Sequence, residues 1–332
     1  MSAKIIKTVC SVPCNCCGST DAEEIGRRDR DNNPLRTVVC RKCGLVWTDP
    51  RPNPDEVKKF YAKDYRIQYK GAYSPKLKHV YRAGRVAFNR YGQIKELLRA
   101  GDAVLDVGSG GGEFVYVLRK LGYDARGIEP NEGYGLYAQK ELDLPVQIGF
   151  VQQIEFPAES FNVITLSHVL EHLDDPLGTL KKIRSWLRPE GFLVVEVPNV
   201  EGTCYAPAHR FHLAHLYNFN PVALETIGGK ASFAVHKTML TPDKGVIITT
   251  FKRIEHAPEI SGEIPGNFER VRAIVARHTT FAHYLTLAPY TRPLQKAQQR
   301  NAEMKAIKGR ASGQEVLDSI VSELTEQTAG IH

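Results

Sequence analysis

Four cysteines near the start of the chain have the spacing of metal ligands. Cys14 and Cys17 form one C-x2-C pair, Cys40 and Cys43 form a second, and a glycine follows each pair. Two such pairs supply the four thiolates of a structural zinc site, and the glycines allow each pair to close into a tight turn. The spacing therefore predicts a zinc ribbon over residues 1–50, with unligated or redox-active thiols as the alternative.

A glycine-rich loop follows an apolar run in the middle of the chain. The sequence VLDVGSGGGEF, residues 104–114, passes from β-branched residues into glycines and then into a helical pattern, which predicts a strand, a tight loop and a helix. Glycines lack the Cβ atoms that would hold a nucleotide away from the backbone, and a helix N-terminus offers free N–H groups. Gly108, Gly110 and Gly112 are therefore candidate ligand-binding residues.

Acidic residues flank this loop. Asp106 precedes the first glycine by two residues, and Glu129 ends the next predicted strand. A carboxylate at Asp106 would repel a pyrophosphate, but it suits a ligand that carries an ammonium and a sulfonium cation. Glu129 is placed to accept hydrogen bonds from both hydroxyls of a ribose. The pattern favours a cationic thioether nucleoside over a dinucleotide.

Taken together, the motifs DVGSGGG, GIEP and HVLEH resemble those of the class I S-adenosylmethionine (SAM) methyltransferases over roughly residues 98–253. The resemblance implies an α/β fold, with a Rossmann-like seven-stranded sheet that ends in an antiparallel hairpin. It places the adenine of SAM against Val151 and Gln152. The cofactor-binding residues expected on this basis are Asp106, Gly108, Gly110, Gly112, Glu129, Val151, Gln152 and Ser167.

The segment SHVLEHL, residues 167–173, follows the fourth predicted strand and carries the candidate catalytic residues. His168, Glu171 and His172 would lie near one another within one helical turn. The segment resembles the E-x-x-E-H element with which ubiquinone-pathway and small-RNA 2′-O-methyltransferases hold a divalent ion, with His168 in place of the first Glu. A possible second metal at His168, Glu171 and His172 follows from this resemblance.

Other interpretations of these histidines stay open. In metal-free catalysis, an imidazole oriented by a carboxylate would remove the proton of the attacking hydroxyl. Histidines in loops also serve purely structural roles. The string H-x-x-E-H is a zinc-peptidase signature as well, but that activity would need a different fold and a further acidic ligand.

A long aromatic segment after the fifth predicted strand contains three more histidines, His209, His212 and His215. It lacks a regular period, which suits an insertion that binds the acceptor. The string HLYNF, which begins at His215, is similar to HLYYF in bacterial methyltransferases associated with surface-polysaccharide clusters. His215 is therefore a candidate second base or distal metal ligand.

The remaining regions predict domain organisation rather than chemistry. Tyr61, Tyr65, Tyr69 and Tyr73 recur every four residues and form either a packing stripe or a cap over the site. The expected organisation is a zinc ribbon (1–50), a helical linker or cap (51–97), a SAM-binding methyltransferase domain (98–255) and a basic helical extension (256–332).

The positive charge of the chain is concentrated in the C-terminal extension. Between Gly266 and Arg310, nine Lys and Arg residues stand against two Glu residues, an excess that equals the net charge of +7 for all 332 residues. Interspersed apolar residues such as Val271, Phe281 and Leu285 make the region amphipathic. We expect this face to pack on the protein core. A dimer arm and a surface for anionic glycolipid, membrane or RNA are the alternatives, and residues 313–327 predict a further short helix.

Composition indicates a soluble globular protein. The chain is 42% hydrophobic, contains no apolar run long enough for a transmembrane helix, and starts without a signal-peptide pattern, so we expect a cytoplasmic protein. The sequence predicts SAM-dependent methylation of a sugar hydroxyl on a nucleotide sugar or polysaccharide end, with a small-molecule or glycan acceptor as partner. The alternatives are an RNA-modifying methyltransferase that grips RNA with the ribbon and basic tail, a sugar C-methyltransferase, and a non-enzymatic SAM-binding subunit. A homo-oligomer formed through the C-terminal helices is possible.

Overall fold

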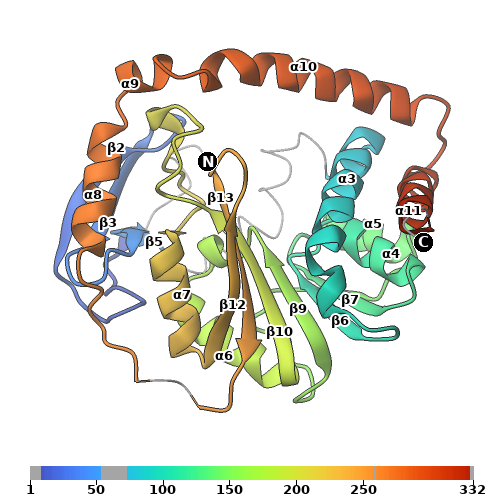
Figure 1. Cartoon of the computed structure of the whole chain (residues 1–332), viewed down its shortest axis with the longest axis horizontal. Helices are drawn as coiled ribbons and strands as arrows, with labels where there is room; N and C mark the ends of the chain where they lie inside the picture. The colour runs from blue at the N-terminus through green and yellow to red at the C-terminus, as the bar shows by residue number, and fades with distance from the viewer. Residues whose placement is uncertain (1–8, 54–72, 257–258, 330–332) are drawn as a thin grey trace. The chain divides into compact units, whose positions relative to one another are not determined.

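The computed structural model describes residues 9–53, 73–256 and 259–329 (Figure 1). The expected tyrosine stripe falls mostly outside them, at Tyr61, Tyr65 and Tyr69. The chain divides into two compact units, Met1–Val57 with Leu166–Pro293 and Lys58–Thr165 with Leu294–His332.

The main feature is the seven-stranded α/β sheet that the sequence predicts, which is thus confirmed. In order across the sheet, its strands are β12 (Phe233–Leu240), β13 (Val246–Arg253), β10 (Leu187–Pro198), β9 (Phe161–Ser167), β6 (Ala103–Val107), β7 (Asp124–Glu129) and β8 (Val146–Ile148). β6, β7 and β8 pair in parallel, whereas β13 pairs antiparallel with both β10 and β12. The predicted terminal hairpin is therefore β12–β13.

In the second unit, helices cover the strands that follow the glycine loop. The helices are α3 (Leu77–Ile94, followed by the 3-10 turn η2, Lys95–Leu97), α4 (Glu113–Lys120), α5 (Glu132–Glu141) and α11 (Gly313–Ala329). The side chain of Asn131 caps α5 by accepting a hydrogen bond of 3.2 Å from the Tyr134 N–H, as its position before the helix predicts. α11 packs on α3, where Leu317 and Ile320 lie so close to Gly84 that a larger residue there would clash with them.

In the first unit, α6 (Pro176–Trp186) and α7 (Pro221–Lys230) begin at side-chain caps. Asp175 accepts from the N–H of Gly178 and Asn220 from that of Ala223, each with a proline at the next position. α7 lies beside β12 and β13 (Figure 1). β10 starts at Leu187, but its pairing with β13 begins only at Phe192, after Glu190, whose φ is 64°.

The N-terminal cysteine region forms a second sheet that includes a strand from far along the chain. Its order is β11 (Tyr217–Asn218), β4 (Val46–Thr48), β3 (Pro34–Cys40) and β2 (Ala22–Arg28), all antiparallel. The short strands β1 (Val9–Cys10) and β5 (Arg51–Pro52) pair separately. Trp47 faces Tyr217 across the β4–β11 pair, so the ribbon completes its sheet with a strand that follows the methyltransferase-like motifs.

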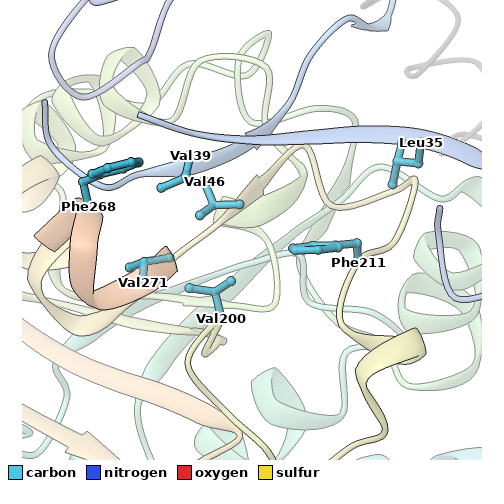
Figure 2. Packing of buried hydrophobic residues seen from close by; sticks show 7 residues of the cluster. All are labelled: Leu35, Val39, Val46, Val200, Phe211, Phe268 and Val271. Atoms are coloured by element: carbon cyan, nitrogen blue, oxygen red, sulfur yellow. The ribbon is translucent and has the colours of Figure 1, made fainter. Parts of the chain in front are cut away.

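A hydrophobic cluster joins this ribbon to segments distant in sequence (Figure 2). Val39 and Val46 come from the ribbon strands, Phe211 from the histidine-rich segment, and Phe268 and Val271 from α8 (Asn267–Arg277). Burying such side chains contributes about 1.5–3 kcal/mol each. The start of the basic extension is therefore part of the core of the first unit.

The rest of the basic extension is helical as predicted, in α9 (Thr280–Tyr284) and α10 (Ala288–Ile307). The expectation that its apolar face packs on the core holds for Val271 but is wrong for Phe281, Tyr284 and Leu285, whose side chains are exposed. Among the described residues, no helix has the length and apolar character needed to cross a bilayer.

Candidate active site and zinc centre

The four predicted zinc ligands converge in the ribbon. The Sγ atoms of Cys14, Cys17, Cys40 and Cys43 all lie within 4.8 Å of one another. Zn–S bonds of about 2.3 Å in a tetrahedron require S–S separations of about 3.8 Å, so the four thiols fit a zinc ion. Cys14 and Cys40 also accept backbone hydrogen bonds from Gly18 and Gly44, both of which have positive φ. The glycines therefore close the two turns as the sequence predicts.

The neighbours of this cluster fix it to the first unit. The Asn267 side chain donates a hydrogen bond of 2.8 Å to the Cys43 carbonyl and accepts one of 2.7 Å from Asn220. Lys230 donates to the carbonyl of Cys16 at 2.8 Å. Cys16 itself is buried beside the cluster, whereas Cys10 is exposed.

The glycine loop has the backbone conformation that only glycine adopts readily. Gly108, Gly110 and Gly112 have φ values of 77°, 60° and 83°. Gly112 also lies against Leu144 and Ala138, which leave no room for a Cβ atom. The loop leads directly into α4, whose first residue is Glu113. The N–H groups of the glycine loop therefore lie at the N-terminus of α4.

The two predicted acidic residues are buried beside this loop. Glu129 accepts hydrogen bonds from the N–H groups of Gly110, at 2.8 Å, and Asn131, at 3.0 Å. Asp106 accepts one from the Thr165 hydroxyl at 2.7 Å. Both carboxylates are therefore held in place beside the glycine loop by hydrogen bonds from their neighbours. Farther on, Val151 is buried and Gln152 half-buried in the turn after β8.

The histidine motif lies in the first unit, where β9 ends at Ser167 and the 3-10 turn η3 (Leu170–His172) follows. Glu171 is only 1% exposed, with His168 Nδ1 at 3.4 Å and His172 Nε2 at 3.8 Å from its Oε1 atom. Neither oxygen of Glu171 makes a hydrogen bond of standard geometry within the described part of the chain. The turn therefore brings the three residues together, as predicted, around a buried carboxylate.

A carboxylate that the sequence analysis did not identify holds His168. Glu196 on β10 lies 3.0 Å from the Nε2 atom of His168. Desolvation by the surrounding protein lowers the pKa of His168, but the carboxylates of Glu171 and Glu196 outweigh it and raise this pKa to about 9. The ring is therefore protonated at neutral pH. Glu196 lies in a strand whose side chains alternate between the two faces of the sheet. This alternation predicts the face on which Glu196 lies but not its contact with His168.

His172 is oriented by the histidine-rich segment. Its Nδ1 atom lies 2.7 Å from the backbone carbonyl of Ala214. A carbonyl only accepts hydrogen bonds, so Nδ1 carries the proton and, in the neutral ring, Nε2 carries the lone pair on the side of Glu171. This arrangement gives His172 a basic nitrogen beside a buried carboxylate.

His215 joins the same cluster. Its ring centroid lies 4.9 Å from that of His172 and 5.1 Å from that of His212. Burial and the neighbouring His172 and His212 lower the pKa of His215 well below its usual value, which keeps the ring neutral and able to ligate a metal. The potential ligand atoms of Glu171, His172 and His215 lie within 4.8 Å of one another. As a set of possible metal ligands, the geometry therefore groups His215, rather than His168, with Glu171 and His172.

Comparison with known proteins agrees with these motifs. A family model described as "Methyltransferase domain" matches residues 79–238. The ubiquinone biosynthesis O-methyltransferase of Histophilus somni (strain 2336) is 34% identical over 106 residues, which are 29% of this chain and 44% of that protein. The enzyme of the same name from Actinobacillus pleuropneumoniae serotype 7 (strain AP76) is 36% identical over 110 residues, 30% of this chain and 47% of that protein.

Among solved structures, a SAM dependent methyltransferase from Aquifex aeolicus is similar to 61% of this chain and 99% of its own, with 19% identity and a TM-score of 0.43. The chain spans less than half the length of the two curated relatives named above. The match to the methyltransferase family model therefore covers residues 79–238, just under half of the chain.

Proposed function

We propose that this protein transfers the methyl group of SAM to a hydroxyl of a sugar, on a nucleotide sugar or a polysaccharide end. The observation that carries the proposal is the orientation of His172, whose Nδ1 is held by the Ala214 carbonyl while Nε2 lies 3.8 Å from the buried Glu171 carboxylate. A hydroxyl must lose its proton to attack the methyl carbon, and this pair is built to take that proton.

The glycine loop and its acidic neighbours would hold the cofactor. Asp106 is proposed to attract the ammonium group, and Glu129, which is buried beside the glycine loop, to accept hydrogen bonds from the ribose hydroxyls. Positive φ at the glycines supports close approach of the backbone to the nucleoside. Val151 and Gln152 would line the adenine site, and Ser167 lies at the carboxyl end of β9, where open α/β sheets bind ligands.

SAM supplies the activated methyl group, so the protein has to orient the acceptor and remove a proton. His172 Nε2 would accept that proton, and the Glu171 carboxylate would stabilise the resulting imidazolium. Because its pKa of about 9 keeps His168 protonated near neutral pH, His168 would serve as a fixed cation beside Glu171 and Glu196 rather than as the base.

The same residues also fit a divalent metal ion. Glu171 is buried without a hydrogen bond of standard geometry within the described residues, and the donor atoms of Glu171, His172 and His215 converge. One carboxylate and two imidazoles are a donor set that zinc and other transition metals accept. A bound ion would lower the pKa of a coordinated acceptor hydroxyl. We propose His215 in place of His168 as its third ligand.

The choice of a hydroxyl as acceptor is supported by the ubiquinone biosynthesis relatives, which are named as O-methyltransferases. The choice of a sugar rests on the similarity of the HLYNF string at His215 to methyltransferases of surface-polysaccharide clusters. In the structure this string contributes β11, and Thr48 donates a hydrogen bond of 3.4 Å to the carbonyl of His215. The ribbon therefore supports the backbone of the proposed acceptor-binding segment.

The test is to incubate the protein with SAM and a panel of nucleotide sugars, with tRNA as the competing acceptor class, and to detect methylated product by mass spectrometry. We expect methylation of at least one sugar and loss of this product in the variant His172→Ala, which should still bind SAM. Methylation of tRNA alone, or cofactor binding without turnover on any acceptor, would contradict the proposal.

A further inference from the structure

The helix α9 exposes its apolar residues and buries polar ones. His283 is 5% exposed, and its ring packs against that of the buried His278. Phe281, Tyr284 and Leu285 lie on the same short helix or directly after it, and their side chains are exposed. This pattern is the reverse of that in an ordinary surface helix, whose apolar face lies against the core. The exposed side chains therefore require an explanation outside the packing of the unit.

The exposed apolar cluster continues into α10. We define it as Phe281, Tyr284, Leu285, Leu287 and Tyr290, which are between 55% and 77% exposed. The Tyr290 hydroxyl donates a hydrogen bond of 3.1 Å to the carbonyl of Tyr284, so the two helices present their aromatic residues side by side. A contiguous group of large apolar side chains at the surface commonly marks an interaction site.

The charges around this cluster have one sign. Residues 270–293, the part of this region that belongs to the first unit, contain no Asp or Glu and four Lys or Arg residues. Three of these cations are paired within the unit, Arg270 with Glu201, Arg272 with Glu23, and Arg292 with Asp243. The fourth, Arg277, is exposed and has no carboxylate partner among the described residues.

We propose that residues 277–290 attach the protein to an anionic lipid surface, with the exposed apolar cluster inserted between the lipids and Arg277 on a headgroup phosphate. Aromatic and leucine side chains beside an unpaired cation, in a segment without Asp or Glu, are typical of helices that lie in the membrane interface. Self-association through this segment would place two positively charged, acid-free surfaces together, which is unfavourable. RNA would account for the cations but not for exposed leucines.

The test is co-sedimentation of the full-length protein with vesicles of phosphatidylcholine alone or mixed with phosphatidylglycerol. We expect binding to the mixed vesicles, weakening as salt is added, and little binding to phosphatidylcholine. The double variant Leu285→Glu/Leu287→Glu should bind about tenfold or more weakly. The matched control Val86→Glu/Leu240→Glu changes two exposed apolar residues outside the cluster and should bind as the wild type does.

A second variant tests the cation separately. Arg277→Gln should reduce binding to the mixed vesicles and flatten its salt dependence, with an unchanged thermal unfolding midpoint because this side chain is exposed. Three results would overturn the inference: no binding to the mixed vesicles, equal binding by the Leu285→Glu/Leu287→Glu variant, or a wild-type protein that dimerises or binds RNA through these residues instead of binding vesicles.

Discussion

The backbone N–H of Gly110 donates a hydrogen bond of 2.8 Å to the carboxylate of Glu129. Glu129 ends β7 and Gly110 lies in the loop after β6, and the other carboxylate oxygen accepts from Asn131 just before α5. One side chain therefore fixes the loop that would hold the cofactor and the entry to the following helix. It is also the group proposed to bind the ribose.

The variant Glu129→Ala should lose SAM binding, because it removes both the ribose acceptor and the support of the Gly110 backbone. We expect at least about a hundredfold weaker affinity, since several hydrogen bonds to a charged group are lost together. Isothermal titration calorimetry measures the affinity, and metal analysis provides the control, because the zinc content of the ribbon should not change. Wild-type affinity in this variant would exclude the proposed pocket.

The variant Glu171→Gln should reduce turnover about a hundredfold or more while SAM still binds, because an amide cannot stabilise the protonated His172. Product formation and SAM affinity are measured on the same preparation. A parallel variant, Glu201→Gln, changes a carboxylate of the same unit that pairs with Arg270 and should retain activity. If Glu171→Gln turns over at the wild-type rate, the Glu171–His172 pair does not take the proton.

Measuring the metal content of single variants distinguishes the two proposed metal sites. Cys40→Ser should release the ribbon zinc and lower the thermal unfolding midpoint, because four converging thiols without their ion lose the binding energy that holds a small module together. The control Cys10→Ser alters an exposed cysteine outside the cluster and should keep the zinc. His215→Ala should leave the ribbon zinc in place and remove only a second ion, when native mass spectrometry detects one. Retention of one zinc per chain by Cys40→Ser would argue against a four-thiolate site.

Stability should fall in mild acid because of His278. Burial, with the nearby charge of Arg210, lowers the pKa of His278 from 6.5 to about 4. The unfolded chain then binds more protons than the folded chain between these values, so this contribution to stability is complete above pH 6.5 and is lost progressively as the pH falls toward 4, by about 3 kcal/mol in all. Urea unfolding of the wild type and His278→Gln at pH 7.5 and 5 measures the difference. Parallel pH profiles for the two proteins would contradict this assignment.

Local features of the fold were predictable because short-range chemistry determines them. The glycine after each cysteine pair and the glycine loop after an apolar strand both determine backbone conformation within a few residues. Their positions in the sequence therefore predicted turns and a loop that the structure contains.

Contacts between distant segments were not predictable in the same way. The pairing of β11 with β4, the approach of Glu196 to His168, and the packing of Val271 on the ribbon each join residues far apart in the chain. A periodic pattern shows that a helix or strand has an apolar face but does not identify what covers it. For the same reason, the exposure of Phe281 and Leu285 could not be inferred from their amphipathic spacing.

The membership of β11 in the ribbon sheet has a consequence for biosynthesis. Tyr217 and Asn218 supply the edge strand beside β4, and they are translated well over a hundred residues after Thr48. While the ribosome is still making the intervening segment, the nascent N-terminal region has a sheet edge with open backbone groups. Its final assembly must therefore await the chain that carries His215, so a truncated product would lack a finished ribbon as well as the histidine cluster.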